Sequence, residues 1–449
     1  MNYKNKKVLV IGLARSGKAA IRLLNKLGAD IYLSERKEPS KEDLSFLDEY
    51  KVTVYNQDMS VFEKDYDLVI KNPGVPPVSP IVKRLNERNI PIITEIELAY
   101  SVSKPQHYIA ITGTNGKTTT TTLVYEILKV AYKDKALVGG NIGTPLCELV
   151  LNHNLMEEEG YYISLEISNH QLVDIDSFRP EVSTIINLGP DHLETMGSLE
   201  AYYKSKTEVY RNQKDNDLFL MNIDDELVKE YTNKYPVKCN VSTFSTSDEA
   251  DAYLKDNNLY INDSLLISRD KIKIVGIHNI QNILVSALAC LKVGVSKDII
   301  ASVIENFAGV EHRIEFVREV NGVRYYNDSK GTNVDATITA MKAFVSNVIL
   351  LVGGYEKGLD VKPMIPYLSS VKQIIGFGAS GKRIAFDLVN NPIVVGDLIE
   401  AINEANKIAT KGDIVLLSPT TSSYDQYSGY EERGRHFKQI VNSLWMINI

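Results

Sequence analysis

The sequence predicts an α/β protein of three successive domains, and three observations lead to this prediction. At 449 residues the chain is longer than one hydrophobic core usually supports. Short β-branched runs alternate with helical stretches along most of the chain, which is the pattern of parallel sheets covered by helices. A linker at residues 103–105 contains a proline, and a polar segment begins near residue 311. We therefore expect domains at residues 1–104, 105–309 and 310–449.

The first domain is expected to be Rossmann-like. The segment at residues 18–28 has a helical pattern, and the segment at 72–80, which contains Asn72 and Gly74, forms a proline-fixed loop after a strand. Such loops at the carboxyl ends of strands often contact ligands. The expected strands cover residues 8–11, 31–33, 68–70 and 92–93.

A glycine-rich turn follows the first strand and contains Gly12, Ser16 and Gly17. Glu35 ends the second strand, where dinucleotide sites place an acid that binds the ribose. Ala14, however, stands where a glycine would let the backbone approach a pyrophosphate. A nucleotide-binding turn and a tight turn without a ligand both remain open.

The second domain contains the most informative segment, TGTNGKTT at residues 112–119. It lies between the apolar run at 108–110 and a helical segment at 121–131. A glycine-rich turn before a helix directs backbone N–H groups at phosphate oxygens. A lysine adds charge for the terminal phosphates, and the following hydroxyl can bind Mg²⁺. Only the second half of the Walker A pattern is present, but the segment predicts ATP binding through Gly113, Thr114, Asn115, Gly116, Lys117, Thr118 and Thr119.

Further polar residues follow other strands of the same domain. Glu166 ends the apolar run at 161–165, so it is well placed to hold Mg²⁺ beside the phosphate loop. His192 follows the run at 182–188, and a ligand role and a structural role are both open. Lys206 lies on a helix expected at 201–210, whose simplest interpretation is a solvated face. The remaining polar candidates are Asn141, Ser168 and the pair Asn279 and Asn282, which are spaced to share one helix face.

Residues 253–267 alternate in the manner of short antiparallel strands. The third domain is expected to be a second Rossmann-like sheet. Its segment at 376–381 fits G-x-G-x-x-G, but no acid ends the following strand, so we assign no cofactor to it. Polar strand ends at 327–333, 353–358 and 418–430 are expected to meet in a pocket for a small anion. The strands are expected at residues 323–326, 348–352, 373–375, 393–395 and 414–417.

The composition limits the classes of function. The net charge is −7, which argues against non-specific nucleic-acid binding. Cys147, Cys239 and Cys290 are far apart and lack C-x-x-C spacing, so we expect reduced thiols. No apolar run has the length that spans a bilayer. We expect a cytoplasmic monomer that binds no nucleic acid and does not insert into a membrane.

Taken together, these fragments resemble the Mur ligase family of ATP-dependent enzymes that form peptide bonds in cell-wall synthesis, over essentially the whole chain. The matching pieces are TGTNGKTT, the acid in LEIS, His192, GIHNIQN, and EHR followed by NDSKGTN. The segments DSKGTN and SPTTSSYDQY are similar to the branch that adds D-glutamate to UDP-N-acetylmuramoyl-L-alanine. The resemblance implies a role in peptidoglycan precursor synthesis, and through it in cell shape and division.

The resemblance also implies a role for each domain: the first binds the UDP substrate, the second ATP and Mg²⁺, and the third D-glutamate. It implies that the catalytic residues are Lys117, Glu166, His192 and Lys206. The implied metal ligands are Thr118, Glu166, His192 and a carbamylated Lys206. Beside the phosphate loop, the implied nucleotide contacts are Asn279, Asn282, Arg313 and Asp328. The implied UDP-substrate contacts are Gly12, Ser16, Gly17, Ser34, Glu35, Arg36, Asn72, Gly74, Asn141 and Ser168. The implied D-glutamate contacts are Lys330, Thr332, Lys357, Ser423 and Tyr430.

The implied reaction is amide-bond formation through an acyl phosphate, with ADP and phosphate as products. Positioning and charge neutralisation supply the catalysis in such a reaction. Either His192 or a phosphate oxygen accepts the proton of the attacking amine. Because the ligands bind different domains, we expect hinges near residues 103–106 and 308–312.

Three other interpretations stay open at this point. Two glycine-rich turns would suit a nicotinamide-dependent oxidoreductase. A ligase of the same family could add another amino acid or extend folates. A nucleotide-binding regulator could use the phosphate loop without any turnover.

Overall fold

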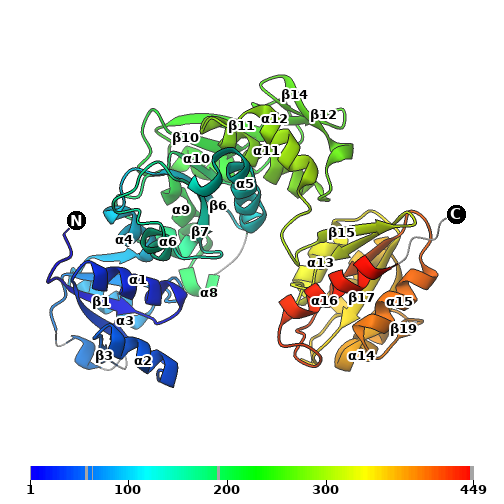
Figure 1. Cartoon of the computed structure of the whole chain (residues 1–449), viewed down its shortest axis with the longest axis horizontal. Helices are drawn as coiled ribbons and strands as arrows, with labels where there is room; N and C mark the ends of the chain where they lie inside the picture. Colours follow the sequence, from blue (N-terminus) through cyan, green and yellow to red (C-terminus); the bar gives the residue numbers. More distant parts are fainter. Residues whose placement is uncertain (1, 56–58, 63, 190–192, 445–449) are drawn as a thin grey trace. The chain divides into compact units, whose positions relative to one another are not determined.

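The computed structural model of the chain describes residues 2–55, 59–62, 64–189 and 193–444. Three β-sheets are present, and the chain forms two compact units (Figure 1). The first unit holds residues 1–268 and 280–303, and the second holds residues 269–279 and 304–449. The α/β class is confirmed, whereas the domain boundaries drawn from the sequence stay predictions. None of the helices in the described ranges has the length and apolarity needed to cross a membrane.

The first sheet has five strands in the order β3-β2-β1-β4-β5, and all of its pairs are parallel. The four expected strands occur, and β3 is an addition. The order reverses beside β1, and ligands bind at such switch points in open α/β sheets. The strands are β1 Lys7–Ile11, β2 Asp30–Ser34, β3 Thr53–Tyr55, β4 Leu68–Lys71 and β5 Ile92–Thr94, with helices α1 Arg15–Lys26, α2 Lys41–Glu49 and α3 Pro80–Glu87.

The second sheet has nine strands in the order β14-β13-β12-β11-β10-β9-β6-β8-β7. It is parallel from β7 to β12, and the antiparallel strands expected at residues 253–267 occur as β12, β13 and β14. Three strands, β7, β10 and β11, were not expected. The strands are β6 His107–Thr112, β7 Ala136–Gly140, β8 Tyr162–Glu166, β9 Val182–Ile185, β10 Leu218–Asn222, β11 Asn240–Ser245, β12 Ala252–Lys255, β13 Asn258–Ile261 and β14 Ser264–Ser268.

The helices of this sheet carry many of the candidate residues. The long helix α5 begins directly after the phosphate loop, and the short helix α7 follows the strand that ends in Glu166. The helices are α5 Lys117–Tyr132, α6 Leu146–Asn152, α7 Asn169–Leu172, α8 Leu193–Met196, α9 Leu199–Thr207, α10 Glu226–Lys234, α11 Ile277–Lys292 and α12 Lys297–Asn306.

The third sheet has six strands in the order β15-β16-β20-β17-β18-β19 and lies in the second unit. The five expected strands occur, and the antiparallel edge strand β15 is an addition. The strands are β15 Glu315–Val320, β16 Val323–Asn327, β17 Val348–Gly353, β18 Val371–Phe377, β19 Ile393–Val394 and β20 Ile414–Leu417, with helices α13 Val334–Lys342, α14 Gly378–Leu388, α15 Leu398–Ile408 and α16 Tyr430–Ser443.

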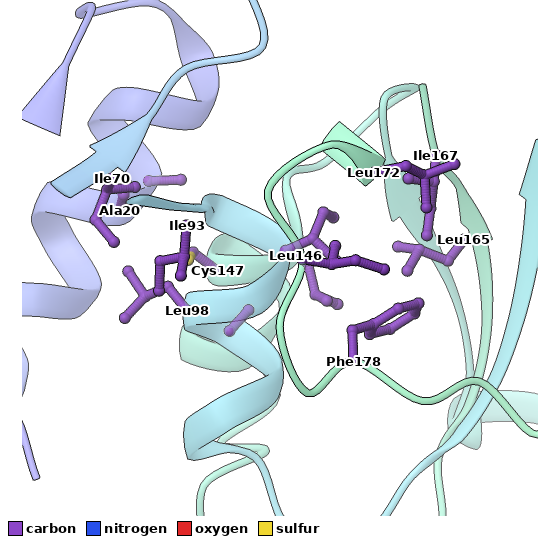
Figure 2. Close-up of a cluster of buried hydrophobic side chains, with 14 of the residues drawn as sticks. Ala20, Ile70, Ile93, Leu98, Leu146, Cys147, Leu165, Ile167, Leu172 and Phe178 are labelled. Carbon is purple, nitrogen blue, oxygen red and sulfur yellow. The ribbon is translucent and has the colours of Figure 1, made fainter. Parts of the chain in front are cut away.

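One continuous core joins the first two sheets. Helix α4 (Glu95–Val102) leads from the first sheet to the second, and its residue Leu98 is fully buried. Figure 2 shows Ala20, Ile70 and Ile93 of the first sheet and its helices in the same cluster as Leu146 and Phe178. The two sheets therefore bury apolar surface together.

Glu97 of α4 fastens this junction with a buried carboxylate. Its Oε2 accepts from the backbone N–H groups of Asp176 at 3.0 Å and Phe178 at 2.9 Å. Its Oε1 accepts from the N–H of Ser177 at 2.9 Å and from the Ser177 hydroxyl. A fully buried carboxylate that satisfies several donors holds its segment in one place.

Replacing Glu97 by Ala should lower the free energy of unfolding by about 3 kcal/mol, because the buried N–H of Phe178 and the half-buried N–H groups of Asp176 and Ser177 would lose their charged acceptor. Urea unfolding followed by circular dichroism measures this change. The control Glu87→Ala removes an exposed carboxylate at the end of α3 and should cost less than about 0.5 kcal/mol. Equal losses in both variants would contradict the anchoring role.

Candidate functional site

The phosphate loop is built by the turn between β6 and α5. Gly113 has a φ of +150° and Gly116 a φ of +83°, which are backbone conformations that residues other than glycine rarely adopt. A Cβ on Gly116 would lie 2.5 Å from Oδ1 of Asn282. Gly116 precedes the first turn of α5, so the helix directs its free N–H groups into the loop.

Asn187, just after β9, braces the loop and was missed in the sequence analysis. It accepts from the N–H of Asn115 at 2.8 Å and donates to the carbonyl of the same residue at 3.1 Å. Its own carbonyl accepts from the N–H of Thr114 at 3.0 Å. The loop conformation is thus fixed from the neighbouring strand without a ligand.

Two lysines meet at the loop. Lys117 donates to the carbonyl oxygens of Gly113 and Thr114, both at 2.8 Å. Lys206 donates to the same Gly113 oxygen at 2.9 Å and lies 4.6 Å from the ring centre of Tyr202. Lys206 is only 1% exposed, so the interpretation of its helix as a solvated face is wrong for this residue, although Lys204 is exposed. Two cations at one carbonyl make this loop strongly attractive to an anion.

Glu166 ends β8 beside the loop, as the sequence predicted. It pairs with Ile111 of β6 and is 2% exposed. Its Oε1 accepts from Nδ2 of Asn141 at 2.9 Å, whereas its Oε2 is buried and has no hydrogen-bond partner among the described residues. A buried carboxylate oxygen without a donor fits a hard cation such as Mg²⁺.

The other predicted metal ligands have different outcomes. Thr118 lies in the first turn of α5, on the loop that adjoins Glu166. His192 lies outside the described residues. Ser168 is an expected UDP-substrate contact and not a metal ligand. It follows Glu166 by two residues and caps α7 together with Gln171.

A cavity of about 1030 Å³ opens at the carboxyl ends of the first sheet. This volume is at the upper end of the range for small-molecule sites. Five predicted residues line it: Gly12, Glu35, Arg36, Asn72 and Gly74. Residues that the sequence analysis missed also line it, among them Lys37, Ser40, Phe62 and Arg84.

Five other predicted residues do not line this cavity. Asn141 and Ser168 lie beside Glu166 in the second sheet. The remaining three belong to the first sheet and its helix α1. Gly17 packs its helix against the first strand, since a Cβ there would lie 2.1 Å from the carbonyl oxygen of Gly12. Ser34 is fully buried in β2. Ser16 is half-buried in the first turn of α1 and is not among the lining residues.

The carboxylate of Glu35 accepts hydrogen bonds from backbone N–H groups of this chain. Its Oε2 accepts from the N–H of Leu13 at 2.7 Å, inside the glycine-rich turn. Its Oε1 accepts from the N–H groups of Arg36 at 2.7 Å and Lys37 at 3.1 Å. Glu35 thereby shapes the cavity wall, and the turn already holds a carboxylate where a dinucleotide would bring a phosphate.

The two asparagines of α11 have separate partners. Asn282 is buried, and its Oδ1 accepts from the hydroxyl of Thr120 at 3.2 Å behind the phosphate loop. Asn279 donates from Nδ2 to the carbonyl of Val275 at 2.7 Å. Asn282 therefore contacts the first turn of α5 behind the loop, whereas a nucleotide contact of Asn279 stays a prediction.

In the second unit, Arg313 lies between two strained residues. His312 has a φ of +64° and Ile314 a φ of +45°, and a left-handed backbone is costly for a β-branched residue. Two hydrogen bonds hold His312. Its backbone N–H donates to Glu315, and its Nδ1 accepts from Asn327 at 2.9 Å. This strain presents the exposed Arg313 side chain away from the core, which fits a binding role.

Asp328 is buried at the end of the neighbouring strand β16. Its Oδ2 accepts from the Ser418 hydroxyl at 2.7 Å, and its Oδ1 accepts from the N–H of Ile314 at 3.2 Å. Burial raises the pKa of the Asp328 carboxyl to about 7, despite these donors. Asp328 therefore titrates near neutral pH.

The polar strand ends of the third sheet meet as expected. The N–H of Thr420 donates to Gly331 at 2.9 Å, and the N–H of Tyr355 donates to Ser422 at 2.8 Å. Arg433, which sequence reasoning missed, is fully buried and donates to the backbone oxygens of Ser329 and Thr421. It thus ties together two of the three segments.

The predicted D-glutamate residues lie on these segments. Lys330 lies 5.8 Å from the ring centre of Tyr430, and Lys357 donates to the carbonyl of Thr332 at 3.5 Å. Ser423 is buried, and its hydroxyl has no partner among the described residues. The structure gathers these five residues at one edge of the third sheet, whereas their contacts with an amino acid stay a prediction.

The G-x-G-x-x-G segment at residues 376–381 has a packing role. A Cβ on Gly376 would lie 2.3 Å from the carbonyl oxygen of Gly381, so the two glycines let strand and helix touch. Oδ2 of Asp425 accepts from the N–H of Ala379 at 3.1 Å, in the first turn of α14. The chain's own carboxylate thus binds where a pyrophosphate would bind in a dinucleotide site.

A glycine turn with converging lysines before a helix grips nucleotide phosphates. The class of protein that fold and site define is therefore an α/β protein with a glycine-rich loop of the phosphate-binding type in its second sheet and a separate cavity at the edge of its first sheet. Family models match this chain for the Mur ligase middle domain at residues 111–290 and for the Mur ligase glutamate ligase domain at residues 312–421.

Curated relatives match nearly the whole chain. The UDP-N-acetylmuramoylalanine--D-glutamate ligase of Geobacillus kaustophilus is 38% identical over 452 residues, covering 98% of both chains. The ligase of the same name from Thermoanaerobacter pseudethanolicus is 40% identical over 463 residues, covering 99% of this chain and 100% of the relative. The chain therefore belongs to the Mur ligase family, which confirms the resemblance seen in its motifs.

Solved structures share the fold. The UDP-N-acetylmuramate-alanine ligase MurC of Thermotoga maritima has a TM-score of 0.54 at 19% identity, covering 98% of this chain and 100% of its own. The MurF ligase of Thermotoga maritima, solved in complex with ADP, has a TM-score of 0.55 at 18% identity, covering 98% and 96%. These similarities support the fold class.

The raised pKa of Asp328 makes a prediction about stability and pH. A raised folded-state pKa favours the folded state below the unfolded value near 3.8, and this benefit is lost as the pH rises through about 7. The variant Asp328→Asn lacks this titration. Its free energy of unfolding, compared with that of the wild type at the same pH, should therefore increase as the pH rises from 5 to 8. We expect a relative gain on the order of 2 kcal/mol in urea unfolding.

The control for this prediction is Asp335→Asn, which changes an exposed carboxylate in the first turn of α13. Its stability difference from the wild type should stay constant between the same two pH values. A pH-independent difference for Asp328→Asn would contradict the assignment.

Proposed function

We propose that this chain is the ATP-dependent ligase that adds D-glutamate to UDP-N-acetylmuramoyl-L-alanine, forming an amide bond with release of ADP and phosphate. The observation that carries the proposal is the phosphate loop, with Lys117 and Lys206 at one carbonyl and Glu166 at the adjacent strand end. Relatives that carry this activity in their name match the chain from end to end.

The chemistry explains why the loop is needed. A carboxylate does not condense with an amine in water, so it must first receive a phosphoryl group. Lys117 and the loop N–H groups would hold the transferring phosphoryl group and neutralise its charge. The amine of D-glutamate would then attack the acyl phosphate, and phosphate would leave. His192 or a phosphate oxygen would accept the amine proton.

The metal site would be held by Thr118, Glu166 and His192. Mg²⁺, when bound, supplies positive charge at the phosphate oxygens. The buried, donor-free Oε2 of Glu166 supports this assignment. Carbamylation would replace the Lys206 ammonium, which donates to the Gly113 carbonyl, by an anionic oxygen ligand for Mg²⁺. The buried position of Lys206 close to the loop supports that role for the modified form.

The other two ligands would use the other two sites. The cavity of about 1030 Å³ in the first sheet would hold the UDP end of the sugar substrate, with Arg36 and Lys37 in its wall. The gathered polar residues of the third sheet would hold D-glutamate, with Lys330 and Lys357 facing its carboxylates. Each site thus offers basic side chains to an anionic ligand, although Glu35, Glu38 and Asp43 also line the cavity.

The decisive measurement is phosphate release from ATP with UDP-N-acetylmuramoyl-L-alanine and D-glutamate. We expect Lys117→Ala to reduce turnover by about 10²–10³-fold, because the positive charge that neutralises the transferring phosphoryl group is lost. Lys129→Ala, at the exposed far end of the same helix, should leave turnover unchanged. Phosphate release with another amino acid, or protection from heat by NAD(P)H but not by ATP, would favour the rival interpretations.

Replacing Glu166 by Gln tests the metal assignment. Gln keeps the contact with Asn141 but removes the charge, so the Mg²⁺ concentration for half-maximal rate should rise at least about tenfold. The KM for D-glutamate should change little. An unchanged Mg²⁺ requirement would exclude Glu166 as a ligand.

A further inference from the structure

Lys71, the last residue of β4, is a buried cation that the reaction does not use. Its side chain is fully buried, and its ammonium lies 3.0 Å from Oδ2 of Asp174. It also donates to the carbonyl of Val75 at 3.3 Å. Burying two charges costs more solvation than apolar packing would, so such a pair is weak evidence for stability alone.

One end of this ion pair supports the wall of the substrate cavity. Asn72, Gly74 and Val75 all line the cavity, and they directly follow Lys71 in the chain. The loop is also closed on itself, because Oδ1 of Asn72 accepts from the N–H of Gly74 at 3.1 Å. Because the Lys71 ammonium donates to the carbonyl of Val75, it fixes the position of the loop at residues 72–76 relative to the first sheet.

The other end lies in the segment that leaves the strand of Glu166. Asp174 follows the short helix α7, which begins three residues after Glu166. The residues just after Asp174 are anchored by the carboxylate of Glu97. Asp174 is therefore a fixed point of the second sheet, and both ends of the ion pair belong to the first compact unit.

We propose that the Lys71–Asp174 pair is a positioning device that sets the cavity loop relative to the Glu166 end of the phosphate site. This inference rests on the proposed function and deepens it. The UDP substrate must place its carboxylate where the transferred phosphoryl group arrives. A displacement of the cavity loop by about 1 Å would misplace its contacts with the substrate, which weakens binding and raises the KM for the UDP substrate. Lys71 and Asp174 touch no reacting atom and act through the loop at residues 72–76.

The test compares KM values in a double variant that removes both charges, Lys71→Met with Asp174→Asn. We expect the KM for UDP-N-acetylmuramoyl-L-alanine to rise about tenfold or more, while the KM for ATP stays within about twofold. The single variant Lys71→Arg keeps the charge, so it should retain most of the wild-type affinity for the UDP substrate. If the double variant does not fold, Asp174→Asn alone, which leaves the contact with Val75, serves the same comparison.

Arg22 and Glu148 provide a matched control. They form a 2.9 Å ion pair between α1 and α6, across the same junction of the two sheets, and neither lines the cavity. The variant Arg22→Met with Glu148→Gln should leave every KM unchanged.

The outcomes separate the two proposals. Turnover by the wild type with unchanged KM for the UDP substrate in the double variant would overturn the positioning role alone. Equal rises in the KM of ATP and of the UDP substrate would also overturn it, because they indicate a general loss of structure. No turnover by the wild type would overturn the proposed function and this inference with it.

Discussion

The convergence of two ammonium groups on the carbonyl oxygen of Gly113 is the interaction on which the phosphate-loop edge of the second sheet depends. Lys117 and Lys206 both donate to this oxygen, and Lys117 also donates to the carbonyl of Thr114, so two positive charges lie within one turn of the loop. The loop is held in this state by contacts that need no ligand, through Asn187 and the glycine at position 116. The site is therefore preorganised for a polyanion, and its charge does not have to be assembled during binding.

Local patterns explain which parts of this site the sequence revealed. The loop, Thr118 and Glu166 follow strands directly, so their positions depend on short-range rules. The burial of Lys206 depends on a partner 93 residues away in the chain, and its helix looks solvated by pattern alone. Asn187 acts 72 residues from Asn115 and resembles an ordinary turn residue. Most predicted strands are apolar runs with β-branched residues. Of the missed strands, β7 (ALVGG) and β10 (LFLMN) have few β-branched residues, and β11 (NVSTFS) is polar.

The two glycine-rich turns show a second limit of pattern reasoning. Both suggest dinucleotide sites, yet each binds a carboxylate of its own chain. Glu35 reaches Leu13 in the first sheet, and Asp425 reaches Ala379 in the third, across 46 residues. Because the same free N–H groups attract a side-chain carboxylate and a phosphate, glycine spacing alone cannot distinguish a ligand site from internal packing.

The way the first two sheets are joined restricts where the molecule can move. Residues 103–106 are one of the two expected hinges, and this expectation stays a prediction. In the structure, Lys104 donates its N–H to the carbonyl of Leu155 at 2.8 Å, and the carbonyl of Pro105 accepts from the N–H of Gly160 at 3.1 Å. Gln106 adds a bond to the carbonyl of Glu158. This linker is thus bound along the second sheet, and the core around Leu98 continues across it. The third sheet has hydrophobic cores of its own and belongs to the other compact unit, so the continuous core that joins the first two sheets does not extend to it.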